Sequence, residues 1–233
     1  MIFNQLFDDK SSTYTYIISS GKGREALIID PVIENTEKYL KLLKNLNLKL
    51  VKVIDTHIHA DHISGLNELN KTTNCTRIMG EQSLSEVVDL HVKEGEKIKI
   101  ENIELTSIYT PGHTNCSYSF LMEDRVFTGD TLLINGTGRT DFQNGNAKEQ
   151  YNSIFNRLLK LPEKTLVFPA HDYNGKKFSS IKQEKDNNPR LQVNSETEYV
   201  EKMNNLKLDY PKMIDIALPA NKKGLTMDEI NLN

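Results

Sequence analysis

The sequence predicts an α/β fold in which two β-sheets are covered by helices, within a single domain that spans residues 1–233. Three observations predict it. Apolar segments of strand length fall into two groups, with amphipathic helical segments between and after them. No Gly/Ser-rich or Pro-rich linker, fixed-period repeat or low-complexity tract divides the chain. A chain of 233 residues is also long enough to enclose one large hydrophobic core.

The first half of the chain alternates predicted strands with a predicted helix. Residues 14–18 and 26–29 have the composition of strands, and the second strand stops at Pro31 because proline cannot donate to a ladder. Residues 35–46 place leucines and a tyrosine at helical spacing between lysines and a glutamate, which predicts an amphipathic helix. Residues 50–54 form a buried strand that leads straight into the densest group of metal-ligand-type side chains.

The second half supplies another group of strands and a second amphipathic helix. A short acidic turn at residues 123–124 predicts that the strands on either side of it form a hairpin. Strands in two groups with helices between them predict two sheets, each covered by helices. The elements expected here are a helix at 83–91, strands at 97–100, 103–109, 117–122, 125–128 and 165–168, and a helix at 146–159.

Composition excludes several classes of function. The net charge is -3, with 29 Lys+Arg against 32 Asp+Glu, and no basic run that could follow a phosphate backbone, so nucleic-acid binding is not expected. No apolar stretch reaches the roughly 18 residues that span a membrane, and the first residues lack signal-peptide character. The two cysteines, Cys75 and Cys116, give no disulfide framework, which predicts a cytoplasmic protein. Each is expected to be a buried structural thiol, and Cys116 is a candidate to line the site described next.

Residues 57–62 predict a metal site. They contain His57, His59, Asp61 and His62. Imidazole rings enclosed by a fold must have their nitrogens satisfied, so three histidines in one short segment are costly unless something binds them. The alternation of His57 and His59 suits an extended segment that projects both rings to one side. The alternative is a polar surface loop that happens to be rich in histidine.

Three more ligand-type residues occur where a predicted strand stops: His113, Asp130 and His171. Five of the six histidines therefore lie at strand ends. The sixth, His91, is expected near the end of a helix, where a solvated role is favoured over ligation. Taken together and in this order, the strand-end residues are a strong indication of one metal-binding pocket.

These residues carry a resemblance to a known family. Residues 56–62, followed by His113, Asp130 and His171, resemble the metallo-β-lactamase superfamily, whose fold is an αββα four-layer sandwich with the metal at one edge of the two sheets. The resemblance covers nearly the whole chain. Within that superfamily, further segments are similar to the persulfide dioxygenases (sulfur dioxygenases) of the ETHE1 type. These segments are residues 11–16, 59–65, 138–143, 169–173, 188–190 and 215–221.

The resemblance implies one Fe(II) per chain. It also implies that His57, His113 and Asp130 are both the iron ligands and the catalytic residues. It also implies glutathione persulfide and O₂ as substrates, with sulfite and glutathione as products, in sulfide detoxification. The chemistry of the residues agrees, because two imidazoles and one carboxylate form the facial triad that leaves positions open on Fe(II).

The other four ligand-type residues leave the number of metal ions open. His59, Asp61, His62 and His171 are expected to orient the ligands and to hydrogen-bond bound water or dioxygen. In hydrolases of the superfamily, the same seven residues hold two metal ions instead. Since all seven are present, the ligand inventory alone does not separate one metal from two.

By the same resemblance, Arg139, Tyr173 and Arg190 are expected to contact the tripeptide. Guanidinium groups suit glutathione because it carries two carboxylates. The alternative for either arginine is a structural ion pair. Asp141 is interpreted as a structural partner and not as a catalytic acid.

Two other functions are alternatives. A dinuclear thioester hydrolase of the glyoxalase II type would share the fold and the glutathione moiety, but the segment after His171, with Pro189, Pro211 and Pro219, resembles the dioxygenase tail. A non-catalytic sulfur carrier or partner-binding protein is disfavoured by the intact triad. A homodimer is expected by family analogy only. Any sulfurtransferase partner is expected to be a separate chain, because one superfamily domain accounts for all 233 residues.

Overall fold

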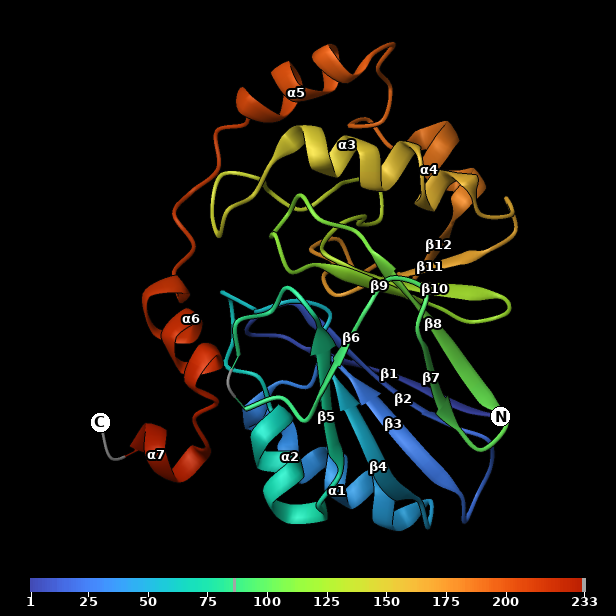
Figure 1. The fold of residues 1–233 in the computed structure, drawn as a ribbon, viewed down its shortest axis with the longest axis vertical. Coiled ribbons are helices and arrows are strands. Elements are labelled where there is room, and N and C mark those ends of the chain that lie inside the picture. Colours follow the sequence, from blue (N-terminus) through green and yellow to red (C-terminus); the bar gives the residue numbers. More distant parts are fainter. Residues whose placement is uncertain (86, 232–233) are drawn as a thin grey trace. The chain divides into compact units, whose positions relative to one another are not determined.

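The computed structural model describes residues 1–85 and 87–231, which form two compact units (Figure 1). The first unit contains residues 1–92, 97–104 and the chain from 211 onward. The second contains residues 93–96 and 105–210. The expectation of one domain over residues 1–233 stays a prediction.

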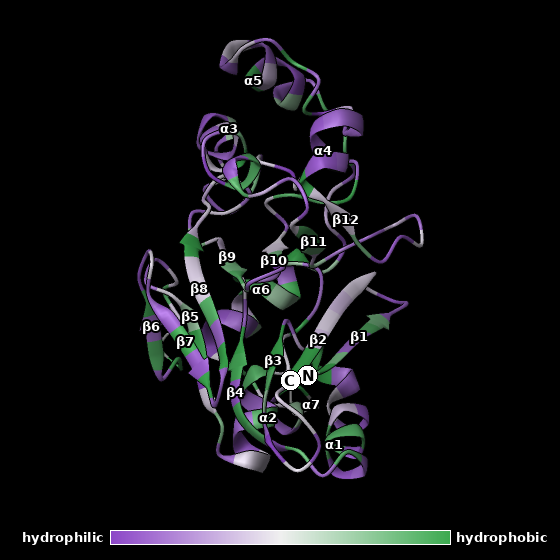
Figure 2. Cartoon of the chain, turned by 90° about the vertical axis from the view of Figure 1, so that its right-hand side faces the viewer, coloured by the Kyte–Doolittle hydropathy of each residue, from purple (hydrophilic) through white to green (hydrophobic). Residues whose placement is uncertain are grey.

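The first sheet belongs to the first unit and has six strands in chain order. They are β1 (Ile2–Asp8), β2 (Thr13–Ser19), β3 (Glu25–Ile29), β4 (Lys49–Ile54), β5 (Thr76–Gly80) and β6 (Leu90–Val92). Strands β1 to β3 are antiparallel neighbours, whereas β3 to β6 run parallel. Figure 2 shows β3 and β4 coloured mainly as hydrophobic, as expected for strands covered on both faces. The strands predicted at 14–18, 26–29 and 50–54 are confirmed.

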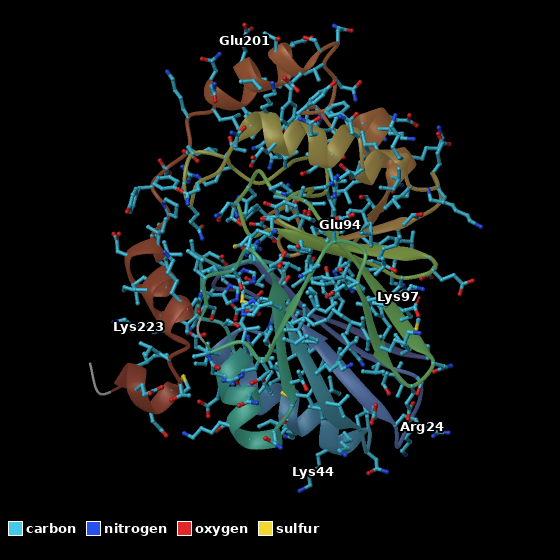
Figure 3. The ribbon with its side chains drawn as sticks, in the orientation of Figure 1. Arg24, Lys44, Glu94, Lys97, Glu201 and Lys223 are labelled. Carbon is cyan, nitrogen blue, oxygen red and sulfur yellow. The ribbon has the colours of Figure 1, made fainter. Side chains whose placement is uncertain are left out.

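Among its described residues, the first unit also contains four α-helices (Figure 1). They are α1 (Thr36–Asn45), preceded by the 3₁₀ turn η1 (Ile33–Asn35), then α2 (Leu66–Thr73), α6 (Ile214–Lys223) and α7 (Met227–Asn231). Tyr39 and Leu43 of α1 share a buried cluster with Leu66 and Leu69 of α2 and with Ile28 of β3. The helix predicted at 35–46 is confirmed, and its polar face, including Lys44, points away from the ribbon in Figure 3.

The second sheet has the order β12-β11-β10-β9-β8-β7. Its strands are β7 (Lys97–Ile100), β8 (Ile103–Tyr109), β9 (Tyr118–Leu121), β10 (Arg125–Gly129), β11 (Leu166–Pro169) and β12 (Ser179–Ser180). Strands β8, β10 and β11 run in the same direction, because β9 is antiparallel to both β8 and β10, and β11 is parallel to β10. The predicted strands and the 123–124 hairpin are confirmed.

Three helices of the second unit cover its strands. They are α3 (Ala147–Phe155), α4 (Ile181–Asn187) and α5 (Glu196–Asn204), with the 3₁₀ turn η2 (Leu158–Lys160) between α3 and β11. Ile154, Ile181 and Tyr199 bring the three helices into one cluster with Val126 and Val167 of the sheet. The helix predicted at 146–159 is shorter than expected, because α3 ends at Phe155 and the 3₁₀ turn η2 follows it. Its first turn is capped by Asn146, whose side chain accepts hydrogen bonds from the amides of residues 148 and 149.

The helix predicted at 83–91 is wrong. Residue 86 lies outside the described residues, and of the others in this range none is helical. Arg77 instead holds Asp89 through its backbone amide and two guanidinium nitrogens, at 2.8 to 3.0 Å. Leu90–Val92 then add to the sheet as β6, parallel to β5. A sheet ladder thus satisfies backbone groups that the sequence pattern assigned to a helix.

Candidate metal centre

The ligand-type residues of the first unit follow two neighbouring parallel strands. Ile29 and Ile54 are paired in the ladder of β3 and β4, so Asp30 and Asp55 leave the sheet side by side at its carboxyl edge. Asp30 is fully buried and has a φ of 50°, a left-handed conformation that aspartate tolerates better than most residues. Its amide donates to the carbonyl of Ile54 at 2.9 Å, which fixes the position of Asp30. Its carboxylate lies next to residues 57–64, which are called the histidine segment below.

Asp30 determines, through Thr56, which ring nitrogen of His57 carries the proton. The carboxylate accepts the Thr56 amide on Oδ1 at 2.7 Å and the Thr56 hydroxyl on Oδ2 at 3.0 Å. Thr56 Oγ1 lies 3.0 Å from His57 Nδ1, and because its only proton goes to Asp30, the imidazole must donate to it. His57 therefore carries its proton on Nδ1 and presents Nε2 as the nitrogen that can bind a metal.

His59 is oriented differently, toward the acids beneath it. Its Nε2 lies 3.1 Å from Asp30 Oδ1, and the ring is fully buried. Burial alone would lower the pKa of His59, but attraction to Asp30, the hydrogen bond with it, and the charges of Asp55 and Asp61 raise that pKa to about 9. Without a metal, His59 is thus an imidazolium paired with Asp30. Burial also raises the pKa of Asp55 to about 7, against the opposing attraction of His59.

His59, Asp61 and His62 form a group that could itself hold an ion, since one ligand atom from each lies within 4.8 Å of the others. His62 Nδ1 contacts Asp61 Oδ2 at 2.8 Å, and the same oxygen accepts the hydroxyl of Thr13 at 3.2 Å. The ring of His59 lies between those of His57 and His62, with centroid separations of 4.2 and 4.3 Å. The predicted cluster is therefore brought together within this unit.

The second unit places the other three predicted residues after strands that run in one direction. His113 follows β8, Asp130 follows β10 and His171 follows β11. His113 Nδ1 donates to the carbonyl of Arg139 at 2.7 Å, so Nε2 is the nitrogen that remains able to bind a metal. That Nε2 lies 3.7 Å from Asp130 Oδ2, and two atoms bound about 2 Å from one ion lie at most about 4 Å apart.

His171 supports Asp130 from behind. Its Nδ1 is 2.6 Å from Asp130 Oδ1, and both groups are buried. An ionised carboxylate can only accept, so the imidazole donates and Oδ2 is left as the oxygen on the side of His113. This arrangement suits a ligating carboxylate that is oriented by a hydrogen bond.

Gly138 is a site residue whose role the sequence reasoning missed. A Cβ atom at Gly138 would lie 2.2 Å from the carbonyl oxygen of Asp130 and 2.8 Å from His113 Nδ1. The backbone must therefore pass against both residues, which only glycine permits. The glycine in the segment 138–143 was the available signal, but only the contact distances give its meaning.

The two arginines expected to bind substrate also have internal partners. Arg139 makes a bidentate ion pair with Asp141, with both N···O distances at 2.7 Å, and donates through Nη1 to the carbonyl of Asp209 at 2.7 Å. Asp141 is thus the structural partner that the sequence indicated. Arg190 donates through Nη1 to the hydroxyl and carbonyl oxygens of Thr137, and burial lowers its pKa.

Tyr173 differs from the arginines in being 70% exposed. Its ring is parallel to that of His171, with centroids 6.2 Å apart and planes 4° apart. It is therefore placed beside a proposed site residue with its phenol in solvent.

The remaining expectations concern the cysteines, His91 and the membrane. Cys75 and Cys116 are both buried thiols, as predicted, and burial raises the pKa of the Cys75 thiol. His91 lies on β6, exposed, and in none of the candidate metal groups formed by the described residues. Among those residues, no helix combines the length and apolarity needed to cross a membrane.

Comparison with known proteins gives strong similarities. The sequence profile of the metallo-β-lactamase superfamily matches residues 8–171. The mitochondrial persulfide dioxygenase ETHE1 of Mus musculus is 42% identical over 226 residues, 96% of this chain and 88% of the mouse protein. The crystal structure of ETHE1 from Myxococcus xanthus is 45% identical, with a TM-score of 0.93 over 95% of this chain and 98% of that chain. A hydroxyacylglutathione hydrolase of Dictyostelium discoideum is 30% identical over 212 residues, 86% of this chain and 78% of that protein.

Proposed function

This chain belongs to the metallo-β-lactamase superfamily and, within it, to the persulfide dioxygenases, and we propose that it oxidises glutathione persulfide with O₂. One persulfide, one O₂ and one water give one glutathione and one sulfite, with both oxygen atoms of O₂ ending in products. The main support for this activity is the similarity to persulfide dioxygenases over most of both chains. The predicted metallo-β-lactamase fold is confirmed by the same comparisons.

The superfamily and the histidine and carboxylate groups together support a metal cofactor. We propose that this metal is one Fe(II) per chain, ligated by His57, His113 and Asp130. Each imidazole carries its proton on Nδ1, so each offers Nε2, and Asp130 offers Oδ2. Two neutral nitrogens and one carboxylate are the donor set of non-haem Fe(II) oxygenases. The three residues therefore suit Fe(II).

The other four residues are proposed to support this set. His171 holds Asp130 through Oδ1, and His59 Nε2 hydrogen-bonds Asp30. Asp61 and His62 contact each other beside them. These contacts orient the side chains through one ligand-type atom each, which supports an orienting role.

When bound, Fe(II) with this ligand set provides neighbouring positions for a persulfide sulfur and O₂. The chain's own residues bind and orient the substrate. A guanidinium has five N–H groups, of which Arg139 uses three in internal hydrogen bonds, so others remain for a substrate carboxylate. We propose that Arg139, Arg190 and the exposed Tyr173 contact the tripeptide.

A dinuclear glutathione thioester hydrolase is the second candidate. The observation that favours it is the group of His59, Asp61 and His62, which could hold another ion. The identity to a hydroxyacylglutathione hydrolase, 30%, is lower than the 42% identity to the mouse dioxygenase. We therefore propose the dioxygenase as the main activity.

Oxygen consumption with glutathione persulfide separates the two candidates. Protein loaded anaerobically with Fe(II) is mixed with glutathione persulfide in air-saturated buffer, and O₂ and sulfite are measured together. We expect O₂ uptake with equimolar sulfite, and little hydrolysis of lactoylglutathione by the same sample. Hydrolysis of the thioester without O₂ uptake would support the hydrolase instead.

Three further expectations belong to this proposal: a cytosolic location, a homodimer, and a separate sulfurtransferase that supplies the persulfide. The mouse relative is described as mitochondrial. Cell fractionation checks the compartment, and sedimentation equilibrium checks the oligomeric state.

A further inference from the structure

The side chain of Asn221, on α6, is bound to the histidine segment at three points. Its Nδ2 donates to the carbonyl oxygens of His59 and His62, each at 2.9 Å. Its Oδ1 accepts the backbone amide of Ser64 at 2.8 Å. One amide side chain from the end of the sequence thus satisfies three backbone groups of the segment 59–64.

That segment needs such partners because it is buried without forming a regular helix or strand. His59 and His62 are 0% and 4% exposed, and Ser64 belongs to an isolated β-bridge with Val32 and to no described strand. Buried backbone groups without a hydrogen-bond partner are costly, and here neither a ladder nor a helix supplies one for these carbonyls. The carboxamide of Asn221 has both donors and an acceptor, which matches what the segment presents.

The rest of the C-terminal segment, residues 211–231, holds Asn221 in place. Ala217 and Ala220 on the same helix pack in a buried cluster with Ile33 and with Ile63, which lies inside the histidine segment. Gly224 ends α6 with a φ of 66°, and a Cβ atom there would lie 2.2 Å from the side-chain nitrogen of a residue on α2. The end of α6 is therefore packed closely against α2.

Two contacts from α7 to α2 complete this anchoring. The amide of Met227 donates to Glu68 Oε2 at 3.1 Å. Lys71 and Asp228 form an exposed ion pair at 2.6 Å, which adds little by itself. The C-terminal segment is thus fixed to the same unit on both sides of Asn221.

We propose that Asn221 is a positioning residue for the metal centre: it sets the backbone of residues 59–64 and so the orientation of His59 and His62 beside His57. The proposal rests on the proposed function for the identity of the metal, but not for the geometry. It makes the C-terminal segment part of the site, because a change at position 221 alters residues about 160 positions earlier in the sequence.

Two substitutions separate the hydrogen bonds. Asn221→Asp keeps an oxygen for the Ser64 amide but replaces the donor to His59 and His62 with a second acceptor. Asn221→Ala removes all three bonds. Asn45→Asp, an exposed change on α1 of the same unit, is the matched control for the added charge. Fe(II) affinity is measured by competition with a colorimetric chelator, and amide hydrogen exchange at Ser64 is measured on the metal-free proteins.

Both Asn221 variants should bind Fe(II) about 10- to 100-fold more weakly than wild type and Asn45→Asp. Exchange at Ser64 should accelerate in Asn221→Ala and stay slow in Asn221→Asp. Loss of affinity in folded Asn221→Asp, with Ser64 protected, supports positioning over a general loss of structure. Wild-type Fe(II) affinity in both variants, with unchanged kcat, would overturn the proposal. Absence of O₂ uptake by the wild type would contradict the proposed function alone.

Discussion

At the scale of single residues, hydrogen bonds decide which nitrogen of each histidine can meet a metal. His57 and His113 each donate from Nδ1, the first to a threonine hydroxyl and the second to a backbone carbonyl. His171 donates from Nδ1 to Asp130. Because the acceptors fix these protons, they determine which nitrogen of each histidine could bind a metal.

Replacement of Thr56 tests this arrangement. Thr56→Val keeps the shape of the side chain but removes the hydroxyl that joins Asp30 to His57. We expect Fe(II) affinity to fall about 10- to 100-fold, since groups that orient ligands contribute on this scale. Thr56→Ser should retain most of the affinity. Equal affinity in the valine and serine variants, measured by chelator competition, would show that the hydroxyl is dispensable.

Gly138→Ala tests the close packing behind His113. Its Cβ would meet the carbonyl oxygen of Asp130 at 2.2 Å, so the backbone must shift, at a cost of about 1–3 kcal/mol. Gly136→Ala is a matched control, because the nearest atom to its Cβ, on Leu133, is 3.8 Å away. We expect lower iron content and a lower Tm only for Gly138→Ala. Similar Tm values for the two variants would be inconsistent with this packing.

Arg190→Ala should separate substrate binding from metal binding. We expect KM for glutathione persulfide to rise while iron is retained, because the guanidinium contacts Thr137 and none of the proposed ligands. Steady-state kinetics and metal analysis on the same sample check this. Loss of iron would mean that Arg190 supports the metal centre.

The candidate ligand-type residues could be recognised from the sequence, whereas the residues that support them could not. Histidines and an aspartate at successive strand ends form a strong pattern when they are taken together. Asp30, Thr56 and Gly138 are ordinary residue types whose roles depend on distances to neighbours. Asn221 lies in a segment that resembled a family motif, but its contact with residues 59–64 joins distant parts of the chain.

At the scale of elements, buried polar contacts fix helices to loops near the site. Glu184 of α4 is fully buried and accepts the amide of Asn135 at 2.9 Å and the side chain of Asn188 at 2.8 Å. Burial raises the pKa of Glu184 above its ordinary value of 4.5, against these hydrogen bonds. The folded state therefore holds the proton more tightly than the unfolded chain does.

This raised pKa predicts a pH dependence of stability. The folded state binds more protons than the unfolded state, so the contribution of Glu184 is fully present below pH 4.5 and falls as pH rises through the raised pKa. Glu184→Gln should remove that decline, giving a stability advantage over wild type that grows with pH. Urea unfolding from pH 4 upward measures it, with the exposed Glu201→Gln on α5 (Figure 3) as control. A difference that does not change with pH would contradict the assignment.

Helices and strands could be predicted where the burial of apolar side chains leaves a clear pattern in the sequence. The helix at residues 36–45 has a clear apolar face, and β3 is an apolar run that is buried after its first residue. The segment 83–91 was assigned wrongly because contacts with β5 determine its conformation. Strands β1 and β5 and helices α2, α4, α5, α6 and α7 were not predicted, because their patterns are short or mixed.

At the scale of the whole molecule, the superfamily profile spans residues 8–171 and so includes all seven ligand-type residues. Four of these lie in the first unit and three in the second. The C-terminal segment, outside the profile, returns to the first unit and contacts the histidine segment through Asn221. The fold could be predicted because the order of strand-end residues is specific, but the division into two units leaves no mark in the composition.

The central claim is that one iron is held by two histidines and one aspartate. Metal analysis of protein reconstituted with Fe(II) under anaerobic conditions, and then freed of excess metal, tests it most directly. We expect one iron per chain in the wild type, none in His113→Ala, and one in His62→Ala. Two metal ions per wild-type chain, with one of them lost in His62→Ala, would contradict it.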